Sequence, residues 1–301
     1  EVNKLAAIRN SYTGTELSKD AAGKDYVKYV EDAMKARNPA DFPASFKIDD
    51  AQDPYFNATK AKAYMAKAKA ELTAQGVKFP VKLDTATDIA YTKGLKGDQS
   101  MKANLEAVFG TDTLVVNVVE MDTDNADAST YYAESGSQSN YDIGGYTGWG
   151  PDFGDPYTFL QTLEPEIGAV LIQIGLDYTD DPASSDYKAA TKVGLYEYAK
   201  KVEAGNAVYD DQVKRFKLFA EAEAQLLDDA IILPYMSYGG GFAVTRIVPY
   251  TIPFAAYGND EYKFKGMVVG DKVITLAERD KLKATWEKER AAEYKKLSAK
   301  K

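Results

Sequence analysis

The residues best suited to chemistry are one tryptophan and two aspartates in a glycine- and proline-rich segment, residues 141–156. Trp149 stands three positions before Asp152, and Asp155 follows after three more. A fixed carboxylate beside an indole ring can bind an ammonium group through charge and cation–π attraction, each worth roughly 0.5–2 kcal/mol when partly desolvated. The alternative is a purely structural loop, because aspartate before proline is common in turns.

The backbone of this segment is expected to have a defined shape. Gly148 and Gly150 permit conformations that other residues avoid, whereas the neighbouring prolines restrict φ. Tyr146 and Tyr238 are candidates for the walls of a binding pocket because they stand in loops, although packing is the commoner role for a tyrosine.

The composition excludes much catalytic chemistry. The chain has no cysteine and no histidine, which removes disulfides, thiolate nucleophiles, Ser-His-Asp triads and the usual zinc and haem sites. We therefore expect no cofactor, no metal and no catalytic residue. One enzymatic alternative is a glycosidase pair formed by Asp152 and Asp155, but a single loop rarely places two carboxylates on opposite sides of a bond, ~5–10 Å apart.

The net charge of −9 argues against nucleic acid and anionic membrane surfaces as partners. The first residues, 1–5, show no charged leader followed by an apolar run, and apolar runs fall short of the ~20 residues that span a bilayer. The expectation is a soluble chain, or the soluble part of a larger protein.

The segment with Trp149 follows an alternation of strands and helices. Strands are predicted at 77–83, 114–119 and 141–143. Pro80 indicates that the first of them lies at the edge of a sheet or that its first part is a loop. Helices are predicted between the strands, at 98–109 and 123–134. This order predicts parallel crossovers in an α/β sheet, with the Trp149 loop beyond the carboxyl end of the third strand, where ligands commonly bind.

Further elements are predicted on both sides of this alternation. They are helices near 24–37, over 57–75, over 186–202, over 210–229 and from the capping box at Thr275 onward, together with an apolar strand at 230–235.

Together these features resemble the extracytoplasmic peptide-binding proteins of oligopeptide ABC transporters, the family 5 solute-binding proteins, and especially the streptococcal lipoproteins of the Ami/Ali type. The Trp-Gly-Pro-Asp loop with a nearby Asp-Pro is the most specific shared feature. The strings that carry the resemblance are 52–57, 148–152, 155–156 and 248–254.

The resemblance implies a periplasmic-binding-protein-like fold of type II, cluster C. The expected lobe is α/β, with a mixed, largely parallel sheet flanked by helices. Residues 1–10 would be a crossover remnant from a first lobe, 11–230 the second lobe, and 231–301 a return strand, a loop and a C-terminal helix that packs toward the first lobe. The chain would thus correspond to a C-terminal lobe fragment.

The resemblance also implies a function without catalysis. Oligopeptides would be captured between two lobes outside the membrane and delivered to an ABC permease and its ATPase, and a monomer is expected. Lipidation of the full-length N-terminus would anchor the protein to the outer face of the cell membrane. Asp152 matches the aspartate that pairs with the ligand's α-ammonium group, Trp149 matches an aromatic pocket wall, and Asp155 is expected to shape the turn. A surface interaction or signalling protein with the same fold is the alternative.

Overall fold

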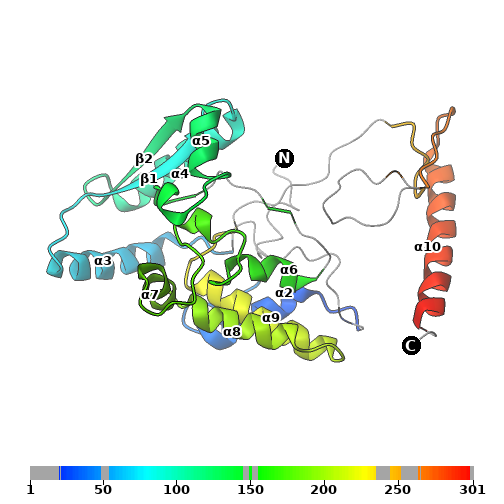
Figure 1. Ribbon diagram of the computed structural model, residues 1–301, viewed down its shortest axis with the longest axis horizontal. Helices are drawn as coiled ribbons and strands as arrows, with labels where there is room; N and C mark the ends of the chain where they lie inside the picture. Colours follow the sequence, from blue (N-terminus) through cyan, green and yellow to red (C-terminus); the bar gives the residue numbers. More distant parts are fainter. Residues whose placement is uncertain are drawn as a thin grey trace. The chain divides into compact units, whose positions relative to one another are not determined.

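A computed structural model describes residues 20, 22–48, 54–144, 149–150, 155–234, 245–251, 264 and 266–298. Two compact units are distinguished (Figure 1). The first unit comprises Glu1–Trp149 and Asp155–Tyr238, and the second comprises Gly150–Gly154 and Gly239–Lys301. None of the helices within the described residues has the length and apolar character that a membrane span requires.

The helical part of the first unit is built on α9 (Gln212–Asp228), against which α2 (Tyr26–Arg37) and α8 (Leu195–Asn206) pack (Figure 1). The ring of Tyr26 meets that of Phe216 edge-on, with 5.5 Å between the centroids. Burial of one large apolar side chain stabilises the fold by roughly 1.5–3 kcal/mol. The largest buried apolar side chains of this core are Tyr26, Tyr198, Phe219, Met34, Ile48, Leu160, Leu163, Leu171, Leu195 and Leu226.

The helices predicted near 24–37 and over 210–229 are confirmed as α2 and α9. Each begins at an aspartate whose side chain accepts a hydrogen bond from a first-turn backbone N–H. The distance is 3.1 Å for Asp25 at α2 and 2.9 Å for Asp211 at α9. Such caps satisfy donors that the helix itself leaves unpaired, so these boundaries are set by local sequence.

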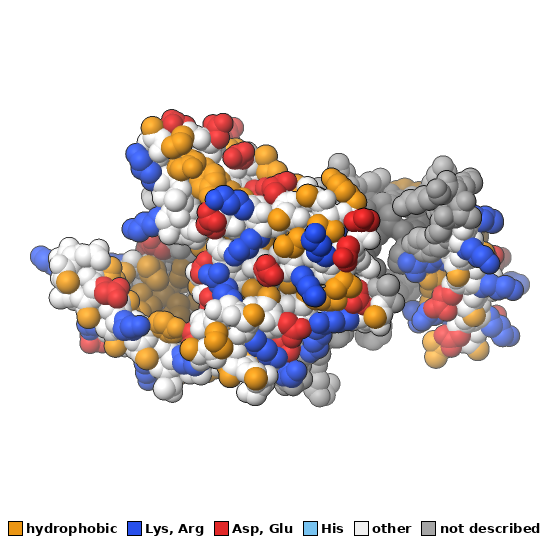
Figure 2. All heavy atoms as spheres, turned by 90° about the horizontal axis from the view of Figure 1, so that it is seen from below, with side chains coloured by type: hydrophobic (Ala, Val, Ile, Leu, Met, Phe, Trp, Pro, Cys, Tyr) orange, Lys and Arg blue, Asp and Glu red, His pale blue; other side chains and the backbone are white. Residues whose placement is uncertain are grey.

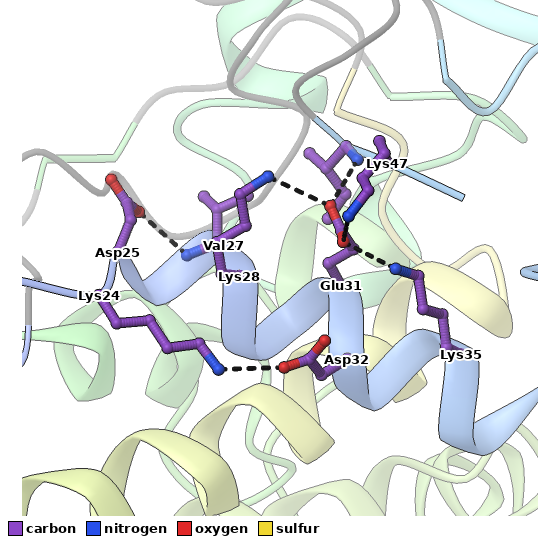
Figure 3. Close-up of polar contacts among 9 residues, drawn as sticks. Lys24, Asp25, Val27, Lys28, Glu31, Asp32, Lys35 and Lys47 are labelled. Atoms are coloured by element: carbon purple, nitrogen blue, oxygen red, sulfur yellow. Dashed lines mark hydrogen bonds and ion pairs between the residues drawn. The ribbon is translucent and has the colours of Figure 1, made fainter. Parts of the chain in front are cut away.

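A buried carboxylate, that of Glu31, ties α2 to the loop that follows it (Figure 3). Its side chain is only 3% exposed, and it accepts hydrogen bonds from the ammonium groups of Lys35 at 2.8 Å, Lys47 at 3.3 Å and Lys28 at 3.4 Å. The Ile48 N–H donates to it at 3.1 Å. Burial by itself would raise the pKa of Glu31, but these donors and the nearby positive charge lower that pKa to about 2.

The sheet of the first unit has two strands in the part of the chain that the structure describes, β1 (Val81–Asp88) and β2 (Leu114–Met121). They are parallel and paired along their whole length, which confirms the predicted parallel crossover. The connecting helix α4 (Thr92–Phe109) packs on both strands, and α5 (Thr123–Ser129) packs on β1 (Figure 1).

The strand predicted at 141–143 is reduced to a single parallel bridge between Thr85 and Ile143. The Ile143 N–H donates to the Asp84 carbonyl at 3.1 Å, as in a sheet. However, the Asp84 N–H is taken by the side chain of Asp142, at 2.8 Å. A side-chain acceptor thus replaces the next backbone acceptor, which explains why this position is a bridge and not a strand.

The strand predicted at 77–83 is shifted toward the C-terminus. β1 begins only after Pro80, so the stretch before it is a loop, one of the two alternatives left open. The strand continues through residues 85–88, which are buried although three of the four are polar. The Asp98 carboxylate accepts a hydrogen bond from Thr87, and the Asp88 carboxylate accepts one from the Thr123 hydroxyl, which makes the burial of Thr87 and Asp88 possible. No hydrophobic alternation could indicate that part of the strand.

The helix predicted over 186–202 is two helices, α7 (Ser185–Lys192) and α8. The break lies at Gly194, whose φ of +81° is in the left-handed region that favours glycine. Its carbonyl accepts a hydrogen bond of 2.9 Å from the Gln225 side chain of α9. The chain therefore turns where a glycine permits it and where a neighbouring helix supplies a partner.

The helices around β2 have bounds that differ from those predicted. α4 begins earlier than expected, at Thr92, and α5 ends at Ser129, well before the predicted residue 134. The hydroxyl of Thr130 donates to the Ala126 carbonyl at 2.6 Å, a local bond that competes with continuation of the helix.

The strand predicted at 230–235 is wrong for its described part, because residues 231–234 form no strand. Ala230 has a φ of +54°, which turns the chain sharply after α9. Pro234 lacks an N–H and so cannot donate to a neighbouring strand.

α3 (Ala58–Ala74) confirms the helix predicted over 57–75, and the Asn57 side chain caps it at 3.0 Å from the Lys60 N–H. No residue of this helix, all of which the structure describes, is buried. Its apolar stripe instead faces a hollow of about 470 Å³, beside α3 in Figure 2. The hollow is lined by Ala61, Tyr64, Met65, Lys67, Ala68, Glu71 and Phe109.

The second unit contains α10 (Leu276–Ser298) and an antiparallel bridge between Ile247 and Val269. The predicted capping box is confirmed, because Glu278 accepts a hydrogen bond from the Thr275 N–H at 2.8 Å and its own N–H donates to the Thr275 hydroxyl at 3.3 Å. The remaining short elements, all in the first unit, are α6 (Pro156–Leu160) and the 3-10 turns η1 (Gly136–Gln138), η2 (Gln161–Leu163) and η3 (Ile172–Ile174).

Candidate functional site

Trp149 packs against the short helix α6. Its side chain is half-buried, and its ring meets that of Phe159 edge-on, with 5.6 Å between the centroids and an angle of 68° between the planes. Edge-on pairs of this kind are favourable because the positive ring edge faces the negative ring face. The indole is therefore held by α6, and part of its surface stays exposed.

Asp155 begins α6 and has a structural role. Its Oδ1 accepts a hydrogen bond from the Tyr157 N–H at 2.9 Å, and Pro156 occupies the first helical position. Both carboxylate oxygens also accept from Arg215 of α9, Oδ1 from Nη2 at 2.8 Å and Oδ2 from Nε at 3.3 Å. The expectation that Asp155 shapes the turn is thus confirmed, and a glycosidase pair that includes it is disfavoured.

The other guanidinium nitrogen of Arg215 reaches the end of α8. Nη1 donates to the carbonyls of Gly205 at 3.0 Å, Asn206 at 3.1 Å and Val208 at 3.1 Å. These carbonyls lie where a helix ends and leaves acceptors unpaired, and a positive charge is favourable there. Arg215 thereby joins the end of α8 to the beginning of α6.

The ring of Phe219 lies beneath the same guanidinium group. The Arg215 Cζ lies 4.6 Å from the centroid of this ring, and the Tyr157 ring of α6 lies 6.3 Å from it. On the opposite helix, a Cβ at Gly205 would lie 2.6 Å from the Phe219 ring, so α8 and α9 approach closely only because residue 205 is a glycine. α6 is therefore supported by a dense contact between α8 and α9.

A second group of polar residues near α6 was not predicted from the sequence. Glu164 is 5% exposed, and its Oε1 has no hydrogen-bond partner among the described residues. Burial raises the pKa of Glu164 to about 8, with further contributions from Glu203 and the charge of Glu166. The Tyr157 hydroxyl donates to Glu203 at 3.5 Å. No sequence signal could indicate that this glutamate, which follows η2, turns inward.

The described residues include only part of the predicted ligand-binding set. Trp149 lies against α6, and Gly150 is exposed, with no atom of the described residues within 4 Å of a Cβ built on it. The remaining members, Asp152, Tyr146, Gly148 and Tyr238, lie outside the described residues. Sequence reasoning also missed Arg215, because its link to Asp155 joins positions 60 residues apart.

Similarity to solved structures defines the class of fold. The chain matches a peptide-binding protein of a peptide ABC transporter with a TM-score of 0.50 and 19% identity, over 77% of this chain and 79% of that one. It matches the pheromone receptor PrgZ with a TM-score of 0.54 and 17% identity, over 88% of this chain and 40% of that one. The fold is thus periplasmic-binding-protein-like, as predicted.

Sequence comparison with curated proteins is more specific. The chain is 38% identical over 292 residues to the oligopeptide-binding protein SarA of Streptococcus gordonii, which covers 96% of this chain and 43% of SarA. It is 37% identical over 254 residues to the oligopeptide-binding protein AliA of Streptococcus pneumoniae, over 83% of this chain and 38% of AliA. AmiA of the same species is 35% identical over 292 residues. No family model matches.

These matches confirm the resemblance to oligopeptide-binding proteins that the sequence strings indicated. They extend over 83–96% of this chain, yet the chain spans less than half the length of the curated relatives. The relatives are named as binding proteins and not as enzymes.

Proposed function

We propose that the chain forms part of an extracytoplasmic receptor that captures oligopeptides. The observation that carries this proposal is the 38% identity over 292 residues to a protein named for oligopeptide binding. The periplasmic-binding-protein-like fold supports it, because ligands in open α/β folds commonly bind beyond the carboxyl ends of the strands.

Within this receptor, Asp152 binds the α-ammonium group of the peptide and Trp149 forms a wall of the adjoining pocket. The contact of Trp149 with α6 supports this assignment, since a half-buried indole held by a helix offers a rigid apolar surface. Gly148 and Gly150 shape the loop, and Tyr146 and Tyr238 line the pocket. A receptor for many sequences should fix the groups that all peptides share and leave the side-chain pockets roomy.

The whole protein, by the same proposal, has two lobes that enclose the peptide and then deliver it to an ABC permease served by a separate ATPase. It works as a monomer without a catalytic step, anchored to the outer face of the membrane by a lipid. Residues 1–10 would connect the lobes, 11–230 would form the second lobe and 231–301 would return toward the first. The present chain would then supply one side of the peptide-binding cleft.

Calorimetry on the protein at its full natural length tests the proposal. A short peptide with a free amino terminus should bind, and the same peptide with an acetylated amino terminus should bind about tenfold or more weakly, because a charge-assisted pair worth at least ~1.4 kcal/mol is lost. Asp152→Asn should weaken the free peptide similarly and have little further effect on the acetylated one. Equal affinity for both peptides would contradict the anchoring role.

A further inference from the structure

We infer that Arg215 is a positioning residue for the peptide site, acting through α6 on Trp149. The effect on peptide binding rests on the proposed function, whereas the contacts that link Arg215, α6 and Trp149 do not depend on it. Arg215 is paired with the residue that caps α6, and α6 carries the ring against which Trp149 packs.

α6 depends on contacts outside itself. It has only five residues, Pro156–Leu160, and isolated helices shorter than ~12–15 residues are marginal in water. Its start is held by Asp155, which caps it and is paired with Arg215. Its first turn is held by Tyr157 against Phe219, the ring that also lies beneath the guanidinium group. The supports at the start and the first turn of α6 therefore meet at Arg215, whereas its last residue is held by the Tyr198 hydroxyl of α8, which donates to the Leu160 carbonyl at 2.5 Å.

Arg215 suits this role because a guanidinium group can bond in several directions at once. Nε and Nη2 are used by Asp155, and Nη1 is used by carbonyls at the end of α8. The side chain is 17% exposed, so water competes little for these donors. A lysine has its donors on a single nitrogen and cannot bridge the same two groups in this geometry.

The segment that contains the proposed anchor is thus bounded by two supported residues. At one end, Trp149 packs on Phe159; at the other, Asp155 is bound by Arg215. Both attachments lie on α6 or at its cap. A displacement of α6 would shift Trp149 and Asp155 together, so loss of Arg215 should disturb the indole.

Trp149 itself provides the readout, because the chain has only one other tryptophan. In the full-length protein, other tryptophans, if present, and Trp286 are replaced by phenylalanine, so that emission reports Trp149 alone. Arg215→Met and Arg215→Lys are then compared with Arg37→Met. Arg37 is a matched control, since it also pairs with aspartates of α9 or its cap, Asp228 at 2.8 Å and Asp229 at 2.7 Å, and does not contact α6.

Both Arg215 variants should shift the emission of Trp149 to longer wavelength, increase its quenching by acrylamide and weaken peptide binding about tenfold. Arg37→Met should lose stability to urea and leave emission, quenching and affinity unchanged. Unchanged emission and quenching in folded Arg215 variants would overturn the inference. So would full rescue by lysine, because charge alone would then suffice.

Two further outcomes can be distinguished from a failure of the inference. If Arg215→Met does not fold, Asp155→Asn takes its place, since asparagine still caps a helix but lacks the charge that pairs with Arg215. It should shift emission in the same direction, and an unchanged emission would overturn the inference. If the parent protein binds no peptide, the proposed function fails, while Trp149 emission still decides the role of Arg215.

Discussion

Lys35 donates to Glu31 at 2.8 Å across one turn of α2, and the carboxylate that it reaches is only 3% exposed. The same carboxylate also accepts hydrogen bonds from the ammonium groups of Lys28 and Lys47 and from the Ile48 N–H. A carboxylate with so many donors is stabilised in its charged form although it is buried. It holds the loop after α2 against the helix.

Glu31→Gln should therefore lower the free energy of unfolding by about 1–3 kcal/mol, because a neutral amide cannot serve the same ammonium groups. Urea denaturation at pH 7 measures the change. Glu197→Gln is the control: Glu197 pairs with Lys200 at 2.6 Å, but its side chain is 69% exposed, and such pairs contribute less than ~1 kcal/mol. Equal losses in the two variants would contradict the role given to Glu31.

The pH dependence of Glu31 follows from its pKa, which is about 2 in the folded chain against an ordinary value of 4.5. The unfolded chain binds the proton more readily, so the stabilisation by Glu31 is present above pH ~4.5 and is lost as the pH falls toward 2. The loss of stability on acidification should be smaller in Glu31→Gln than in the parent. Parallel acid profiles for the two proteins would argue against this linkage.

Glu164 should have the opposite pH dependence. Its pKa is raised to about 8, so the folded chain holds a proton that the unfolded chain, with an ordinary value of 4.5, releases at lower pH. The contribution of neutral Glu164 is complete below pH ~4.5 and is lost as the pH rises through 8, with a cost on the order of a few kcal/mol. Glu164→Gln should flatten the stability profile between pH 5 and 8.5.

Chemical denaturation at several pH values would measure this effect, with Glu166→Gln as a matched control. Glu166 is exposed and its charge contributes least among the causes of the shift, so this variant should keep most of the slope. If Glu164→Gln kept the same slope as the parent, the buried proton would have to be assigned elsewhere.

Gly205 should tolerate no side chain. A Cβ there would lie 2.6 Å from the Phe219 ring, so Gly205→Ala should separate α8 from α9 and cost about 1–3 kcal/mol. Gly97→Ala is the control, because Gly97 lies inside α4 and no atom of the described part of the chain lies within 4 Å of its Cβ position. That variant should gain about 0.5–1 kcal/mol. Thermal unfolding of both variants measures the change in stability. A loss in Gly205→Ala with a gain in Gly97→Ala would show that the contact with Phe219 outweighs helix propensity at residue 205.

Much of the helical structure could be predicted from the sequence because its causes are local. α2, α3 and α9 begin at an aspartate or asparagine that caps them, and α10 begins with a Thr275–Glu278 capping box. Apolar spacing and capping residues lie within a few positions of each other, so a linear pattern contains them. The strand β2 was likewise indicated by its β-branched residues, whereas only the first three residues of β1 lay within the predicted strand.

The candidate site was predicted only as a set of residue types. The sequence by itself determined that Trp149 and Asp155 stand in one shaped segment, and the match of its strings indicated a peptide-binding family. Tertiary structure alone decided that Asp155 pairs with Arg215, that Trp149 packs on Phe159 and that Glu164 is buried near Glu203. The physical reason is that pairing and burial depend on which distant elements come together, and no local spacing records that.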